Sequence, residues 1–532
     1  MRTSWIAAAA AATIGTLGAG AAAAAGQTPQ RPVPPAVLDI MADPPYAGAT
    51  WGLRVVDLES GALVSSLGPD SLFFTGSVRK LFSVAEALDA LGPGHRFRTP
   101  VHRRGTLGPD GVLRGDLLLV ASGDLTLGGR TTRSGAVAFT NFDHTESNSL
   151  GSSILTKPNP LAGIRTLARR VAASGVRRVE GDVVVDDRLF RKFRVPNGNV
   201  LITPITVNDN LIDVTIRPTR AGRPAKVSWR PHSAAFRVRS TARTVARGRP
   251  QTIKLETSKD GRTGIVRGSI PVGYRPPLTG VKTLVQTFAI PDPSAYARTV
   301  LIEALRREGV QVEAAAVARN PAGRLPARRR YPARTRVARY VSPPYSQYAK
   351  LILKVSHNYG ANLSLMYAGL TQGARTRRAA LAVERRTLVR RYGLPADGFR
   401  FPTNGSGSPD SQATPAALMK LLVEMSRRRT FEPYFDALPA LGVDGSLATV
   451  GRSPRNPVIA PAFGKVFAKT GTTIDDTGLK AQNFAGYFDG VSGRRYAYVV
   501  YVNDVTSVKS VADVVKVFED EGEISALLRA DN

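Results

Sequence analysis

Cysteine is absent from the 532-residue chain, and histidine and methionine are scarce, with five residues of each. The lack of cysteine excludes disulfide bonds, thiolate metal sites and a lipid anchor on cysteine. Phosphate-binding loops of the Walker and dinucleotide kinds are missing, as is the Gly-x-Ser-x-Gly turn of many hydrolases. The histidines lack the spacing of metal ligands (His95, His102, His144, His232 and His357). We therefore expect neither a metal nor another cofactor.

Long apolar stretches are also missing beyond the N-terminus, so no later segment is expected to span a bilayer. The chain begins Met1-Arg2 and runs through alanine and glycine to Ala25. This weakly basic start, apolar middle and Ala-x-Ala pattern predict a secretory signal peptide over residues 1–25. An uncleaved membrane anchor is the alternative, but alanine is only weakly apolar, which favours cleavage. We expect a soluble protein outside the cytoplasmic membrane, in a periplasm or cell-wall space.

Acidic residues are outnumbered, because 73 Lys and Arg face 41 Asp and Glu, which gives a formal net charge of +32. Such a field attracts polyanions. For an exported protein, anionic wall polymers or a membrane surface are the expected partners rather than nucleic acid. Solvated, arginine-rich helix faces without a partner would explain the charge equally well.

The length exceeds what a single core supports and predicts two or three domains. Proline and glutamine at residues 27–36 predict a flexible lead-in. A hairpin is predicted over residues 48–65 and a three-stranded meander over residues 465–502. The remaining patterns predict helices at 162–175, 294–309, 345–391, 413–428 and 507–527, strands only at 206–284, and a surface insertion rich in Ser, Thr and Asn at 132–160.

Ser77-Val78-Arg79-Lys80 is the only Ser-x-x-Lys sequence in the chain. Helical residues three positions apart share a face, so the lysine can reach the serine hydroxyl. The apolar spacing that follows predicts one core face of a helix (Leu81, Val84, Ala85 and Leu88). A helix cap is the alternative interpretation, because serine is a preferred N-cap residue.

Two further elements favour catalysis. Ser356-His357-Asn358 lies in a region predicted to be helical, and Lys469-Thr470-Gly471-Thr472 ends a predicted edge strand. The order Ser-x-x-Lys, Ser-x-Asn, Lys-Thr-Gly is typical of penicillin-recognising serine enzymes. His357 is expected to line the wall of the cleft rather than to act as a base.

These residues fit acyl transfer. Ser77 is a nucleophile once a base takes its proton, and Lys80 is that base if burial and the charge of Lys469 keep it neutral. The other expected roles are proton relay to the leaving amine (Ser356), orientation of the substrate backbone (Asn358), binding of a substrate carboxylate (Lys469 and Thr470), close approach of the substrate (Gly471), and an oxyanion hole from two backbone N–H groups (Ser77 and Thr472).

With these motifs in place, the chain resembles the class C low-molecular-mass penicillin-binding proteins, which are D-Ala-D-Ala carboxypeptidases and endopeptidases. Further segments carry the likeness from about residue 38 to residue 515, among them Gly123-Asp124-Leu125-Thr126-Leu127, Val207-Asn208-Asp209-Asn210 and Asn404-Gly405-Ser406-Gly407. The long gap between Lys80 and Ser356 also resembles this family, which inserts two domains there. The chain departs from the family pattern at three places, Thr75-Gly76, His357 and Ser408, none of which removes a reacting group.

The resemblance implies an α/β multidomain fold. A transpeptidase-like (β-lactamase-like) domain of antiparallel sheet plus helices would contain two nested inserted domains rich in β-strand. The expected boundaries are transpeptidase-like parts at 26–98 and 340–532, an inserted domain II at 99–205 and 285–339, and an all-β domain III at 206–284.

The expected function is that of an exported serine DD-peptidase. It would cleave the terminal D-Ala-D-Ala bond of peptidoglycan stem peptides, or D-Ala cross-links, through an acyl-enzyme on Ser77 that β-lactams also form. The alternatives are a β-lactamase or esterase of the same superfamily and a non-catalytic wall-binding protein.

Overall fold

The computed structural model describes residues 31–532 of the chain. The predicted signal peptide lies outside the described residues. Between residues 31 and 532, no helix combines the length and the apolar character that a bilayer span requires. The flexible lead-in predicted at residues 27–36 is wrong for its last part, because Val33 is buried in a hydrophobic core and helix α1 (Pro35–Met41) begins at Pro35.

Both ends of the chain build one five-stranded sheet. Its strand order is β2-β1-β24-β23-β22, and every neighbouring pair is antiparallel. The strands are β1 (Thr50–Asp57), β2 (Leu63–Leu67), β22 (Val466–Asp475), β23 (Gly478–Asp489) and β24 (Arg495–Val505). The predicted hairpin and meander are thus both present, and they join along β1 and β24, where Thr50 pairs with Asn503. β22 forms an edge of the sheet, and among the described residues its outer side is bridged only at the start of the strand, where Phe467 pairs with Ala440.

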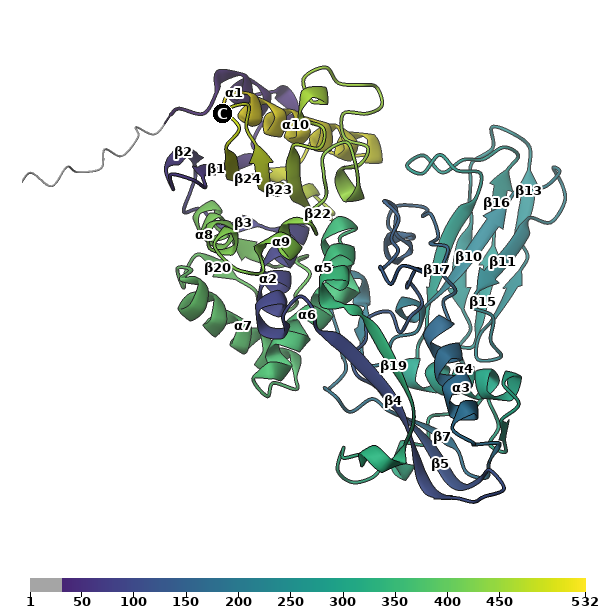
Figure 1. Cartoon of the computed structure of the whole chain (residues 1–532). Coiled ribbons are helices and arrows are strands. Elements are labelled where there is room, and N and C mark those ends of the chain that lie inside the picture. Colours follow the sequence, from purple (N-terminus) through teal and green to yellow (C-terminus); the bar gives the residue numbers. More distant parts are fainter. Residues whose placement is uncertain (1–30) are drawn as a thin grey trace, which may run out of the picture.

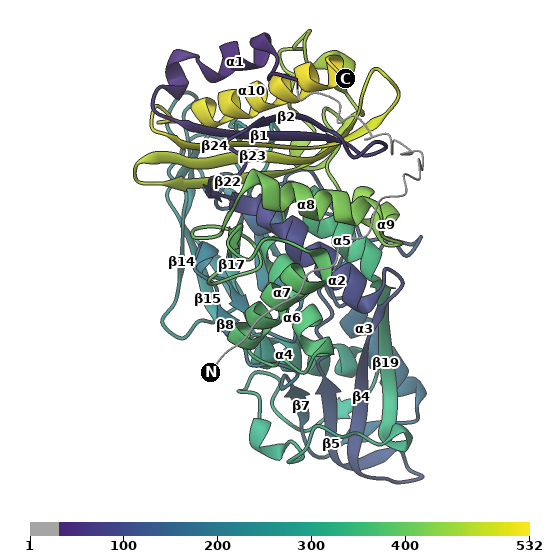
Figure 2. The same cartoon turned by 90° about the vertical axis from the view of Figure 1, so that its left-hand side faces the viewer.

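Helices cover both faces of this sheet (Figure 2). On one face lie α1 and α10 (Val511–Ala530), over a core that includes Leu53, Phe484 and Ile524. On the other face, α8 (Pro415–Ser426) packs against β1 and β24.

A layer of helices lies on the side of the sheet that α8 covers, and α2 (Lys80–Leu91) runs through the centre of this layer. Every residue of α2 from Lys80 to Leu88 is buried. The prediction that only one face of this helix is buried is therefore wrong, because neighbouring helices enclose the helix on its other sides as well. These neighbours are α5 (Tyr345–Lys354), α6 (Asn358–Thr371), α7 (Arg377–Tyr392) and α9 (Phe431–Phe435).

The chain between these two parts forms a body that stands beside them (Figure 1). A mixed sheet of order β18-β6-β5-β4-β19, with β7 pairing β5, carries the two helices α3 (Ala162–Ala173) and α4 (Pro293–Arg307). Its strands are β4 (Arg96–Leu107), β5 (Val112–Val120), β6 (Arg178–Val179), β7 (Val183–Asp186), β18 (Gln311–Val312) and β19 (Arg336–Pro344).

Residues 206–284 contain strands and one 3-10 turn, η5 (Asn208–Asn210), close to the strand-only prediction. The strands are β10 (Leu211–Arg217), β11 (Lys226–Arg230), β12 (Arg237–Ser240), β13 (Arg243–Val245), β14 (Lys254–Thr257), β15 (Thr263–Arg267) and β16 (Ser269–Pro271), and β17 (Leu284–Ala289) pairs with β10. One hydrophobic cluster, reaching from Val101 to Tyr340, includes side chains of both this segment and the mixed sheet. The domain boundaries stay a prediction.

Candidate active site

Ser77 lies on a 3-10 turn, η2 (Gly76–Arg79), that leads directly into α2. Lys80 Nζ lies 2.5 Å from Ser77 Oγ and donates a hydrogen bond to the carbonyl oxygen of Ser406 at 3.0 Å. Neither η2 nor α2 uses Ser77 as its N-cap residue, so the interpretation of Ser77 as a helix cap is wrong. Its hydroxyl is paired with an amine, as a serine nucleophile and its base require.

Lys80 is fully buried. Burial lowers the pKa of its amine to about 7; the carboxylate of Glu146 opposes this shift, and the guanidinium of Arg79 adds to it. Lys80 and Lys469 are like charges that repel each other, and the charge of Lys80 lowers the pKa of Lys469. Near pH 7, a large fraction of Lys80 is a neutral amine that can accept a proton.

Arg79 is a second buried charge close to Ser77, and the sequence analysis did not predict it. Its guanidinium pairs with the carboxylate of Glu384 and lies 3.8 Å from the centroid of the Phe401 ring. Burial and the charge of Glu384 raise the pKa of nearby Glu86 to about 8, so Glu86 is mostly protonated at neutral pH. The sequence feature that could have indicated buried charge here is the pair Arg79 and Glu86, which flank an apolar run of the helix.

Ser356-His357-Asn358 lies where α5 ends and α6 begins, rather than inside one continuous helix. Ser356 has a φ of 60°, a left-handed conformation that is uncommon outside glycine and that tends to occur at functional sites. His357 does not line the cleft wall as predicted, because its side chain is fully buried. Its Nδ1 accepts a hydrogen bond from the N–H of Gly360 at 2.9 Å and so caps α6.

Lys469-Thr470-Gly471-Thr472 lies on the edge strand β22, where the sequence predicted it. Lys469 Nζ donates to the carbonyl oxygen of Thr470 at 2.6 Å, and Thr470 Oγ1 donates to Ser446 Oγ at 2.9 Å. Burial lowers the pKa of Lys469 well below its ordinary value, and the charge of Lys80 adds to this effect. The site thus holds two desolvated amines.

Gly471 and Gly76 allow the edge strand β22 and the turn that carries Ser77 to touch. A Cβ atom on Gly471 would lie 2.4 Å from the carbonyl oxygen of Thr75 and 3.0 Å from the amide nitrogen of Ser77. A Cβ atom on Gly76, whose φ is +46°, would lie 2.7 Å from the amide nitrogen of Thr472. The space beside Gly471, where the substrate was expected to lie, is therefore occupied by the turn that carries Ser77. The same contact brings the two amides expected to form the oxyanion hole near each other.

Residues 132–160 were predicted to be a surface insertion, and this is wrong for their centre. A short 3-10 turn, η3 (His144–Glu146), begins after Asp143, and the side chains of Asp143 and His144 are buried. The turn meets the candidate site where Asn358 Nδ2 donates a hydrogen bond to Glu146 Oε1 at 2.8 Å. Glu146 is a site residue that no sequence motif marks.

The predicted site residues therefore come from three places in the chain, and Glu146 adds a fourth that was not predicted. Ser77, Lys80 and the strand bearing Lys469 are in mutual contact, and Asn358 is linked to them electrostatically through Glu146. Ser356 makes no side-chain hydrogen bond within the part of the chain that the structure describes. Between residues 31 and 532, no cluster of His, Asp and Glu side chains could hold a metal ion.

Solved structures share this architecture. Penicillin-binding protein 4 (dacB) of Haemophilus influenzae superposes with a TM-score of 0.67 at 17% sequence identity, over 91% of this chain and 98% of that one. The same protein complexed with a novel β-lactam gives a TM-score of 0.64 at 17% identity, over 91% and 97% of the two chains. The predicted fold class is thus confirmed: the chain has the fold of a penicillin-binding protein, and its serine–lysine pair occurs within that fold.

The sequence identifies the family. The family model described as the D-Ala-D-Ala carboxypeptidase 3 (S13) family matches residues 35–521, and the chain belongs to this family. A D-alanyl-D-alanine carboxypeptidase of Actinomadura sp. (strain R39) is 27% identical over 478 residues, which cover 85% of this chain and 78% of that protein. The protein is a serine-type D-Ala-D-Ala carboxypeptidase, as the motifs predicted.

Proposed function

We propose that this protein removes the terminal D-alanine of peptidoglycan stem peptides through an acyl-enzyme on Ser77, and that β-lactams acylate the same oxygen. The observation that carries the proposal is the buried Lys80 amine 2.5 Å from Ser77 Oγ. Family membership supplies the substrate class. The proposed location is outside the cytoplasmic membrane, where this substrate occurs.

In the first half-reaction, Ser77 Oγ attacks the carbonyl carbon of the D-Ala-D-Ala bond while Lys80 takes the hydroxyl proton. The N–H groups of Ser77 and Thr472 stabilise the oxyanion of the tetrahedral intermediate. The C–N bond then breaks, and the amine of the leaving D-alanine receives the proton through Ser356. Water later attacks the ester carbonyl and loses a proton to Lys80. The bond between this carbon and Ser77 Oγ then breaks, Ser77 Oγ takes the proton from Lys80, and the shortened peptide leaves.

Substrate binding is assigned to Asn358, Lys469, Thr470 and Gly471. A terminal carboxylate placed between Lys469 Nζ and Thr470 Oγ1 would favour the protonated lysine, which burial disfavours in the free enzyme. Asn358 would hold the peptide backbone. Gly471 acts indirectly, because its missing side chain keeps the edge strand against the nucleophile turn.

The test is D-alanine release from a peptide ending in D-Ala-D-Ala. We expect release by the wild-type protein and its loss after preincubation with one equivalent of benzylpenicillin. Rapid destruction of penicillin with no D-alanine release would contradict the proposal and indicate a β-lactamase. Absence of both activities would indicate a wall-binding protein with an inactive site.

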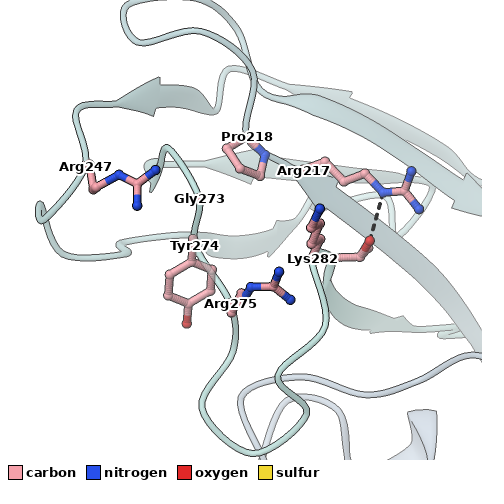
Figure 3. A pocket seen from close by; sticks show the side chains of 8 residues that line it. Arg217, Pro218, Arg247, Gly273, Tyr274, Arg275 and Lys282 are labelled. Carbon is pink, nitrogen blue, oxygen red and sulfur yellow. Dashed lines mark hydrogen bonds between the residues drawn. The ribbon is translucent and has the colours of Figure 1, made fainter.

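The proposal also includes anionic polymers of the cell wall as a binding partner. In the strand-rich segment, a cavity of about 700 Å³ is lined by four cationic side chains and by no carboxylate. Figure 3 shows Arg247 on one side of the hollow and Arg217, Arg275 and Lys282 on the other. Among residues 31–532, none of these four side chains has an acidic partner within salt-bridge distance. Arginine forks suit phosphodiester oxygens, which fits a phosphate-rich polymer.

A double substitution, Arg247→Glu with Arg275→Glu, is expected to reduce sedimentation with purified cell walls several-fold at low salt, because it reverses the charge of the cavity. The matched control, Arg165→Glu with Arg169→Glu, changes the net charge equally at two exposed positions of α3 outside the cavity lining and should bind almost as the wild type does. Equal losses in both variants, or unchanged binding to walls stripped of their anionic polymers, would contradict a specific site.

A further inference from the structure

We propose that Glu146 is a positioning residue of the active site: its carboxylate fixes the amide of Asn358 for the substrate backbone and balances the charges of Lys80 and Lys469. This inference rests on the function proposed above and adds a residue from the insertion at residues 132–160.

Buried ion pairs fix the start of η3. The guanidinium of Arg130 donates two hydrogen bonds to the carboxylate of Asp143, at 2.6 and 2.8 Å, and a third to Asp209 at 2.9 Å. Asp143 Oδ1 in turn accepts the N–H of Thr145 at 3.1 Å. Because Arg130, Asp143 and Asp209 are all buried, these bonds are shielded from water and salt.

The next residue, His144, is held on both ring nitrogens. Nε2 lies 2.7 Å from Asp209 Oδ2, and Nδ1 lies 2.5 Å from Asp213 Oδ1. Burial opposes the charged ring, but the two carboxylates outweigh it and raise the pKa of His144 to about 10. Asp209 also lies 3.3 Å from His357 Nε2, next to Asn358 in sequence. The insertion is therefore tied to the same segment that Glu146 contacts.

The hydrogen bond to Glu146 determines which way the Asn358 amide faces. Nδ2 is committed to Glu146 Oε1 at 2.8 Å, and a flipped amide would place Oδ1 against the carboxylate. Oδ1 is then left buried, with no hydrogen-bond partner among the described residues. An unpaired buried acceptor is costly, and a substrate N–H would satisfy it.

The charges around Glu146 explain why it is a carboxylic acid. Burial raises its pKa to about 7; Lys80 and Lys469 lower it, and Asp143 raises it. Lys80, with its pKa also about 7, feels the same carboxylate and the opposing charge of Arg79. The carboxylate of Glu146 therefore favours the ammonium form of Lys80, and Glu146 helps to set the pH at which Lys80 becomes neutral.

The test is Glu146→Gln, which keeps the size of the side chain and removes its charge. We expect kcat/KM for the D-Ala-D-Ala peptide to fall by about 10–100-fold, because a glutamine amide can face Asn358 with its oxygen or its NH2 group and no longer fixes the Asn358 amide in one orientation. The midpoint of the pH profile for acylation by a chromogenic cephalosporin should move down by about one pH unit, because the ammonium of Lys80 loses its counter-charge.

Glu180→Gln is the matched control, since this carboxylate is exposed and lies outside the site. It should leave the rate and the pH midpoint unchanged. If Glu146 served only to hold the insertion in place, Glu146→Gln would lower the thermal unfolding midpoint without moving the pH profile, and the proposal would be wrong. Wild-type rate and pH midpoint in Glu146→Gln, with Ser77→Ala inactive, would reject Glu146 and leave the proposed function standing. An inactive wild type would reject the proposed function itself.

Discussion

Replacing Ser77 with alanine is expected to abolish covalent labelling by benzylpenicillin and to lower D-alanine release by about 10⁴-fold or more. The reason is chemical: Ser77 Oγ is the hydroxyl that the buried Lys80 amine contacts at 2.5 Å, and alanine leaves no oxygen to form the ester. Substrate can still bind, because the other binding groups are unchanged. The measurement is the intact mass of the protein after incubation with the antibiotic.

Ser71→Ala is the control for this experiment, because Ser71 is an exposed serine six positions before the nucleophile. The wild type and Ser71→Ala should each gain one penicillin adduct, and Ser77→Ala should gain none. An adduct of the same stoichiometry on Ser77→Ala would place the acylated residue elsewhere and overturn the assignment.

Replacing Lys80 with methionine is expected to slow acylation by about 10²–10⁴-fold, the usual contribution of a positioned base. Methionine fills a similar volume but cannot accept the proton of Ser77. In the wild type, burial lowers the pKa of Lys80 to about 7, so the reactive neutral amine predominates above pH 7. The rate of acylation should therefore rise with pH through a midpoint near 7 and fall below it.

Stopped-flow acylation by a chromogenic cephalosporin between pH 5 and pH 10 measures both effects. The pH dependence with a midpoint near 7 should disappear in Lys80→Met and persist in Lys192→Met, which changes an exposed lysine. A wild-type midpoint near 10, the ordinary range of lysine, would show that Lys80 is not held neutral.

Short-range features of the site could be predicted from the sequence. Ser77 and Lys80 are three residues apart, so helix geometry alone places them on one face. The hairpin and the meander follow from alternation and turn residues, and β22 was expected at a sheet edge. The resemblance to the family, rather than a local pattern, predicted that the two ends of the chain share one sheet. Local sequence patterns do not indicate pairing between strands so distant in the chain.

Long-range contacts between polar residues could not be predicted. Glu146 meets Asn358 across 212 positions, and the turn that carries Glu146 is held by buried charges from Arg130, Asp209 and Asp213. The composition of residues 132–160 predicted a polar surface segment. This prediction failed because the burial of charged side chains depends on partners elsewhere in the chain. His357 was misplaced for the same reason: its partners include Asp209, which is remote in sequence.

The pairing of Thr50 with Asn503 has a consequence for how the enzyme acquires activity. A chain is made from its N-terminus, so the nucleophile segment exists long before β22, β23 and β24 do. Closing a loop of this length carries a large entropic cost, and contacts of such sequence separation form slowly. The middle of the chain can fold first around its own core, while Ser77 still lacks β22, the strand whose Thr472 N–H is proposed to complete the oxyanion hole. Activity therefore appears only when the last strands arrive, and a chain that stops short of them is an inert product.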